Sequence, residues 1–159
     1  MTGGARAAVA LRARLDGRPG DSGSALVEFL GLALVLLVPL VYLVLVLGRL
    51  QAATFAAEGA AREAARVFVA SDEPAGATPR ALAAAGLAFA DQGFGDDPAD
   101  AVSIACSAAC LTPGSEVTVG VRIEVPLPFV PPFVRDAVPL SIPVAARRTA
   151  SVEEYREAP

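Results

Sequence analysis

The sequence predicts an α+β protein in which a long N-terminal transmembrane helix continues outside the membrane and packs on a small antiparallel sheet. Three observations support this fold class: an apolar run from about Leu26 to Leu47, helical periodicity after it, and strand-like alternation from Val117 to Val125. We divide the chain into a leader (1–23), a transmembrane helix (24–48), its continuation (49–70), a small α+β domain (71–152) and a tail (153–159).

Composition narrows the class of function. The chain has 159 residues, a net charge of -4 and no histidine, and its 13 basic residues are all arginines. Without histidine it lacks the commonest general base and the commonest metal ligand, so we predict neither an enzyme nor a metal or cofactor site. The acidic balance provides no broad cationic surface for phosphates, and we expect no nucleic acid partner.

The apolar run is long enough to cross a membrane. From Phe29 to Leu47 every residue is apolar or glycine except Tyr42 and Pro39. At 1.5 Å per residue this run spans about 28 Å, close to the roughly 30 Å hydrocarbon core. It is too long for the apolar region of a cleaved secretory signal, although Thr54 to Ala56 resembles a small-residue cleavage site. We predict a retained span in the lipid bilayer.

Arginines are distributed unequally around the run. Arg6, Arg12, Arg14 and Arg18 precede it, whereas Arg49 is the one arginine in the dozen residues that follow. The positive-inside rule therefore predicts a single-pass cell-membrane protein with a cytoplasmic N-terminus and an extracytoplasmic C-terminal domain.

Glu28 stands at the edge of the apolar run, between Val27 and Phe29. An ionised carboxylate at the bilayer centre costs a few kcal/mol on insertion scales. One interpretation is that Glu28 lies near the interface and reaches water. The other is a specific role in assembly, which the neighbouring sequence favours.

The segment Gly23-Ser24-Ala25-Leu26-Val27-Glu28-Phe29, after an arginine-bearing leader, resembles a type IV prepilin signal. This resemblance implies that a prepilin peptidase cuts between Gly23 and Ser24, which makes Glu28 the fifth mature residue. The new ammonium group at Ser24 would lie one helical turn from Glu28. In a bundle of such helices, the carboxylate of one subunit could pair with the ammonium of its neighbour.

Further residues resemble the TadE-like family: Glu28-Phe29, Pro39 in mid-span, and Glu58 to Arg66 after it. The resemblance covers roughly Gly23 to Arg66, and the chain departs from the much shorter major Tad pilins. It implies a pilin-like minor pseudopilin without enzymatic activity, an accessory subunit for a Tad (tight adherence) pilus or a related type II/IV secretion system. Its partners would be prepilin peptidase, other pilin-like subunits and the Tad membrane machinery. The alternative is an uncleaved single-span protein whose extracytoplasmic domain binds a ligand or the cell wall.

We expect one helix from about Ser24 to Ala70, bent near Pro39. Beyond the span, polar residues recur on one face, with Glu58 and Arg62 as a favourable i,i+4 pair. The opposite face carries Leu50, Ala53, Ala57, Ala61, Ala64 and Phe68. This alanine-rich face either covers the chain's own domain or packs against another subunit. Gly59 costs about 1 kcal/mol relative to alanine unless another element packs closely there.

The remaining domain reads as a helix followed by strands. Ser71 to Pro79 is rich in turn residues, and Arg80 to Gln92 predicts a second helix closed by Gly93. The acidic stretch Asp96 to Asp100 lacks the spacing of an EF-hand calcium loop and predicts a solvated turn.

Val117 to Val125 predicts a half-buried antiparallel strand, with weaker candidates at Ala101 to Cys106 and Val138 to Arg148. Pro139 and Pro143 assign the last of these to a sheet edge. Between the strands, Pro126 to Pro139 holds Phe129, Val130, Phe133 and Val134. This segment either contacts a membrane or partner, or folds back over the core.

Cys106 and Cys110 are separated by three residues. In an extracytoplasmic domain we favour a local disulfide over free thiols. Zinc would need more ligands, and the sequence has no histidine.

Overall fold

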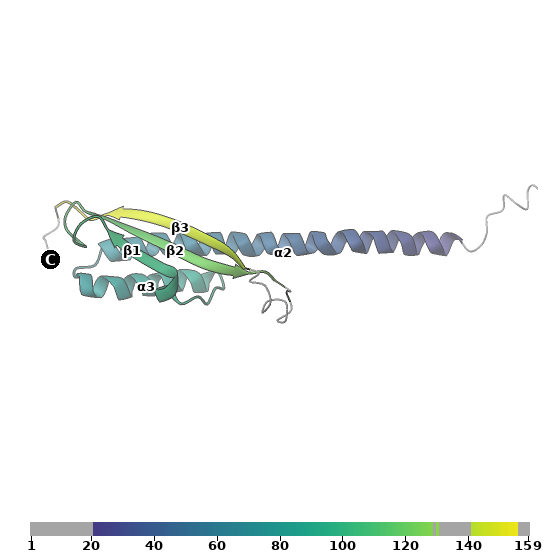
Figure 1. Ribbon diagram of the computed structural model, residues 1–159, viewed down its shortest axis with the longest axis horizontal. Coiled ribbons are helices and arrows are strands. Elements are labelled where there is room, and N and C mark those ends of the chain that lie inside the picture. Colours follow the sequence, from purple (N-terminus) through teal and green to yellow (C-terminus); the bar gives the residue numbers. More distant parts are fainter. Residues whose placement is uncertain (1–20, 129, 131–140, 156–159) are drawn as a thin grey trace, which may run out of the picture. The chain divides into compact units, whose positions relative to one another are not determined.

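The computed structural model describes residues 21–128, 130 and 141–155 (Figure 1). The elements follow in the order α2 (Asp21–Val69), α3 (Pro74–Asp91), α4 (Pro98–Ala101), β1 (Val102–Cys106), β2 (Glu116–Pro126) and β3 (Ser141–Ser151). The chain forms two compact units, one ending at Leu43 and the other beginning at Val44. A long apolar helix and a three-stranded antiparallel sheet confirm the α+β class.

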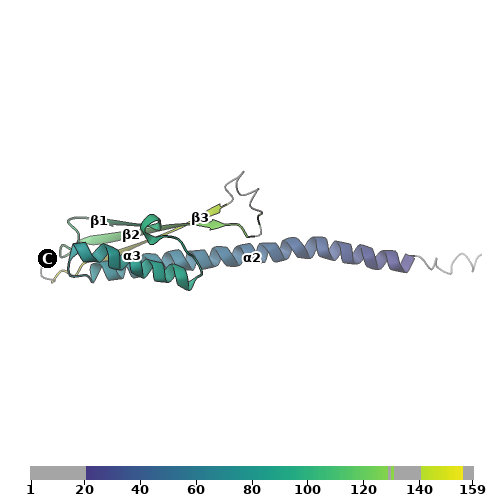
Figure 2. The ribbon, with the colours of Figure 1, turned by 90° about the horizontal axis from the view of Figure 1, so that it is seen from below.

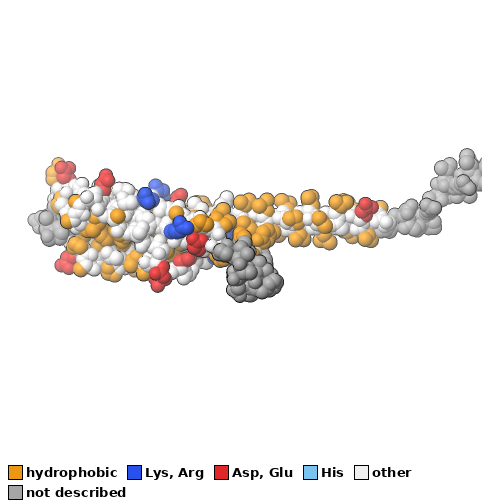
Figure 3. Space-filling view, viewed as in Figure 1, with side chains coloured by type: hydrophobic (Ala, Val, Ile, Leu, Met, Phe, Trp, Pro, Cys, Tyr) orange, Lys and Arg blue, Asp and Glu red, His pale blue; other side chains and the backbone are white. Residues whose placement is uncertain are grey.

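The first part of α2 is the apolar segment. Its side chains from Ser24 to Leu45 are all exposed, and Figure 3 shows hydrophobic side chains along it. This helix is long and apolar enough to cross a membrane. The 22 residues from Leu26 to Leu47 rise about 33 Å, more than the hydrocarbon core requires. Because no core covers them, these side chains are suited to lipid rather than water.

The second part of α2 lies under the sheet. Figure 2 shows two layers, with the sheet above the helices. The predicted alanine-rich face is buried: Ala53, Ala57, Ala61, Ala64 and Phe68 are at most 2% exposed, and Leu50 is half-buried. Ala56, Ala60 and Ala65 join the same core. Of the two interpretations of this face, the structure therefore supports packing on the chain's own domain.

Helix α3 begins earlier than predicted. The sequence placed a break over Ser71 to Pro79, but α3 starts at Pro74, and Pro79 lies within it. A proline lacks the N–H that would bond the carbonyl four residues back, on Ala75. Ala75 is exposed, so water can satisfy that carbonyl and the helix tolerates the proline. The predicted C-terminal end is confirmed, because Gly93 follows with φ of 71°.

The sheet has the order β1-β2-β3, with both pairs antiparallel. β2 is central, and Val117, Val119, Val121, Ile123 and Val125 face the helices. The three predicted strands are confirmed with shifted ends. Pro143 lies opposite Glu124 on β3, which is an edge strand as predicted.

Two local predictions need correction. Asp97 and Asp100 are exposed as expected for a solvated turn, but the stretch leads into the short helix α4, which Asp97 caps through a 2.9 Å bond from the Ala99 N–H. The predicted pair of Glu58 with Arg62 is replaced, because the Glu58 carboxylate lies 3.8 Å from Arg148 on β3. The sequence could not reveal that β3 would bring this arginine to the helix.

Several predictions lie outside the described residues. They concern the leader arginines, Pro139 and most of the Pro126 to Pro139 segment, including Phe129, Phe133 and Val134. Val130, in the same segment, is half-buried.

Candidate processing and assembly site

Helix α2 begins at Asp21, so Gly23, Ser24 and Glu28 lie on one continuous helix. Four residues correspond to a rise of about 6 Å and a rotation of about 40°, which places Ser24 and Glu28 on the same helix face. The structure thus places Ser24 and Glu28 one turn apart on α2, and their pairing between neighbouring subunits stays a prediction. A terminal ammonium at Ser24 would lie one turn from this carboxylate.

The surroundings of Glu28 are apolar and open. Its neighbours Val27 and Phe29 are 70% and 67% exposed, and the Glu28 side chain is also exposed. Among the described residues, no basic side chain forms an ion pair with Glu28. In a bilayer this carboxylate would therefore need water at the interface or a cation from another molecule.

Phe29 and Pro39 do not meet. They are separated by ten residues of α2, a rise of about 15 Å. The helix continues through Pro39, where the missing N–H leaves the Val35 carbonyl without its intrahelical partner. A neighbouring helix could reach that carbonyl, since Val35 and Pro39 are both exposed.

The sequence analysis did not predict the contact of Arg49 with Gly93 and Phe94, which we call the arginine clamp. The Arg49 guanidinium carbon lies 4.0 Å from the centroid of the Phe94 ring, and its Nη2 donates to the Gly93 carbonyl oxygen at 3.1 Å. Arg49 is the one charged residue between Glu28 and Glu58. A lone charge in this stretch could have marked Arg49 as a residue with a specific contact. Its aromatic partner, Phe94, lies 45 positions later and was not predictable from the sequence spacing.

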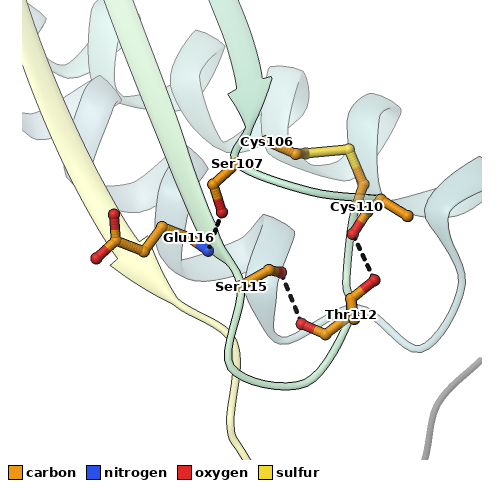
Figure 4. Close-up of a disulfide and its surroundings, with 7 residues drawn as sticks. Cys106, Ser107, Cys110, Thr112, Ser115 and Glu116 are labelled. Carbon is orange, nitrogen blue, oxygen red and sulfur yellow. Dashed lines mark hydrogen bonds between the residues drawn. A yellow bond between two sulfur atoms is a disulfide. The ribbon is translucent and has the colours of Figure 1, made fainter.

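The predicted disulfide is confirmed. It joins Cys106 and Cys110 at the β1–β2 connection, with 5.4 Å between the Cα atoms (Figure 4). Beside it, the Glu116 N–H donates to Ser107 Oγ at 2.9 Å, and Ser107 N–H returns a 2.9 Å bond to the Glu116 carbonyl. These contacts close the turn that leads into β2.

Leu111, the residue after Cys110, has φ of 66°, a left-handed conformation that is unfavourable for a leucine. Its side chain is fully buried in the core. Hydrogen bonds from Thr112 Oγ1 to the Ala109 carbonyl (2.7 Å) and from Ser115 Oγ to the Thr112 carbonyl (2.6 Å) hold the turn around it. The strained backbone is thus offset by burial and by local bonding.

The outer face of the sheet carries an open hollow of about 550 Å³. It lies over Gly120, and its lining includes Ser103, Arg122, Arg147 and Asp100. The glycine creates the depression because a Cβ there would approach Ser103 Oγ to 2.8 Å. Mixed charges around a wide opening do not define a reaction. Within the part of the chain that the structure describes, no three acidic or cysteine side chains gather to hold a metal ion.

Comparisons with protein-family models, with curated proteins and with solved structures found no match for this chain.

Proposed function

We propose that this protein is a pilin-like accessory subunit, a TadE-like minor pseudopilin, for assembly of a Tad-type pilus or a related secretion system. A prepilin peptidase cleaves between Gly23 and Ser24 and leaves the apolar segment of α2 in the membrane. The protein performs no catalysis. The N-terminus is cytoplasmic and the α+β domain lies outside, where the Cys106–Cys110 disulfide can persist.

The observation that carries this proposal is the placement of Glu28 one helical turn after Ser24, at the start of the exposed apolar segment of α2. A simple anchor needs no acid at this position, and an acid costs free energy there. After cleavage, the ammonium group of one subunit can pair with the Glu28 carboxylate of its neighbour. Each charge then offsets the desolvation of the other.

The exposed side chains of the apolar segment fit the same role. Lipid solvates the apolar side chains of a single helix, so these side chains alone do not drive association. Pro39, however, leaves the Val35 carbonyl without its intrahelical hydrogen bond, and another helix can supply a donor. The alanine-rich face from Ala53 to Phe68 is already covered within the domain, so subunit contacts must use other surfaces there.

Processing is tested by determining the N-terminus of the membrane-extracted protein, by sequencing and intact mass. In cells that contain the peptidase, the mature chain should begin at Ser24. The matched control is Gly23→Val, which adds a branched side chain at the cleavage position and should retain residues 1–23. Recovery of intact Met1 to Gly23 from the unchanged protein in such cells would contradict the proposal.

The role of Glu28 is tested separately. Glu28→Gln keeps the shape of the side chain but removes its charge, so membrane insertion and cleavage should persist while subunit assembly falls. The control is Glu63→Gln, which removes another exposed carboxylate far along α2. Normal piliation or secretion in the Glu28→Gln strain would remove the assembly role of this carboxylate.

A second candidate function is an uncleaved single-span protein whose domain binds a ligand outside the membrane. The hollow over Gly120, with Arg122 and Arg147 at its border, is the observation that favours it. The N-terminal determination separates the two, because this candidate retains the leader and is insensitive to Gly23→Val.

A further inference from the structure

The loop between α3 and α4 lies beside the end of the apolar segment. Arg49 follows Leu47, the last residue of the apolar run, by two positions, a rise of about 3 Å. The Arg49 guanidinium donates to the Gly93 carbonyl oxygen at 3.1 Å and stacks on the Phe94 ring. The distance between Gly93 and the end of the apolar run is therefore about the length of the Arg49 side chain.

We propose that this loop, Gln92 to Gly95, rests in the headgroup layer of the lipid bilayer and makes the base of the domain a membrane-contact surface. We call these four residues the base loop. The inference rests on insertion of the apolar segment, which is part of the proposed function, and does not depend on processing.

Bilayer dimensions support this placement. Each headgroup region is about 5–8 Å thick, the difference between the whole bilayer and its hydrocarbon core shared over two sides. With the hydrocarbon ending near Leu47, Arg49 and the base loop tied to its guanidinium lie within this layer.

The surface chemistry of the base loop matches headgroups rather than acyl chains. Gln92, Gly93 and Gly95 are exposed, whereas Phe94 is only 6% exposed and lies under the Arg49 guanidinium. A Cβ built on Gly95 meets no atom within 4 Å, so this position faces open space. The loop therefore offers polar backbone to the membrane and keeps its aromatic ring in the protein.

Carboxylates lie on both sides of the base loop, and they would favour its movement away from an anionic membrane surface, which Arg49 opposes. Asp91 and Asp97 are exposed and Asp96 is half-buried. Anionic headgroups repel all three, and this repulsion favours lifting the loop away from the surface. The clamp opposes that movement because it ties the loop to the residue that leaves the membrane. Arg49 thus holds the domain against the membrane.

The test uses the full chain in liposomes that contain a lipid with a nitroxide on its headgroup. A maleimide fluorophore is attached to Gly95→Cys, and in a matched protein to Ala75→Cys, an exposed site about 24 Å along α3 from Asp91. The paired native cysteines do not react with maleimide. Quenching should be several-fold stronger at position 95. Arg49→Gln should reduce it toward the value at position 75, and Arg80→Gln should leave it unchanged.

Equal quenching at both positions would overturn the proposal, because the domain would then stand away from the surface. Stronger quenching of position 95 by a nitroxide deep in the acyl chains would also overturn it, because the loop would be inserted. Flotation of the liposomes checks insertion, and a chain that fails to float contradicts both this inference and the membrane assignment. Failure of processing alone is detected by N-terminal sequencing and leaves the quenching unaffected.

Discussion

The Arg49 guanidinium lies on the face of the Phe94 ring, 4.0 Å from its centroid, and donates to the carbonyl of the adjacent Gly93. A cation over an aromatic face contributes about 0.5–1 kcal/mol at exposed sites, and a hydrogen bond about 0.5–1.5 kcal/mol. The contact fixes the end of α3, where the Phe94 N–H also donates to the Phe89 carbonyl at 2.9 Å.

Arg49→Ala should therefore open this region locally without unfolding the sheet. We expect the Gly93 and Phe94 amides to exchange hydrogen up to about tenfold faster, corresponding to about 1.4 kcal/mol. Hydrogen exchange of the full chain in detergent measures this directly. Arg80→Ala, which removes an exposed arginine near the start of α3, is the control and should leave both amides unchanged.

Two helix glycines differ in the room that an added Cβ would find, so the two alanine variants should differ in stability. A Cβ at Gly59 would lie 3.9 Å from the Ala88 Cβ, an ordinary contact, whereas a Cβ at Gly86 would lie 3.0 Å from Cγ of Pro98, which is too close. Both glycines are inside helices, so alanine gains the same intrinsic propensity, about 1 kcal/mol. Gly59→Ala should stabilise the domain by up to this amount.

Gly86→Ala should gain less or lose stability, because the rigid proline ring of α4 must move. Denaturant midpoints of the two full-length variants, measured side by side, give the comparison. A Gly86→Ala protein as stable as the Gly59→Ala protein would show that α4 shifts at little cost.

Helices and strands with one buried face were predictable, because periodicity reports burial. The alternation of Val117 to Val125 and the face from Ala53 to Phe68 both lie in the core as expected. The start of α3 was not predictable, since the tolerance of Pro79 depends on the exposure of Ala75. Pairs made by tertiary contact, Glu58 with Arg148 and Arg49 with Phe94, carry no local signal.

The candidate site follows a similar division. The helix of Ser24 and Glu28 could be predicted because both belong to one local segment, and helical geometry fixes their separation. The distance of the base loop from the end of the apolar run could not be predicted, because it depends on how α3 folds back along α2.

The disulfide should add modest stability. For a closed loop of about five residues, the chain-entropy model gives about 2 kcal/mol. The Cys106→Ser/Cys110→Ser double variant should lower the apparent melting temperature by several degrees. It should also lose all sensitivity to reductant, whereas the unchanged protein should melt lower after reduction. An unchanged melting temperature would show that the hydrogen bonds of Ser107 and Thr112 hold the turn alone.

The exposed pair of Glu63 and Arg66 gives a pH prediction. Arg66 Nε donates to Glu63 Oε2 at 2.8 Å and Nη2 to Oε1 at 2.9 Å. These bonds, with the positive charge of Arg66, lower the pKa of the Glu63 carboxyl below its ordinary value. A carboxyl whose pKa is lower in the folded state stabilises the fold above its unfolded pKa and loses that effect as pH falls through the folded pKa.

The contribution is small because both side chains are exposed to water. NMR titration of the Glu63 side-chain carboxyl in micelles should show the lowered pKa, and Arg66→Gln should raise it toward the ordinary value. Above the unfolded pKa, Glu63→Gln should be slightly less stable than the unchanged protein, and this difference should vanish in acid. A Glu63 pKa that Arg66→Gln leaves unchanged would mean that the ion pair does not persist in solution.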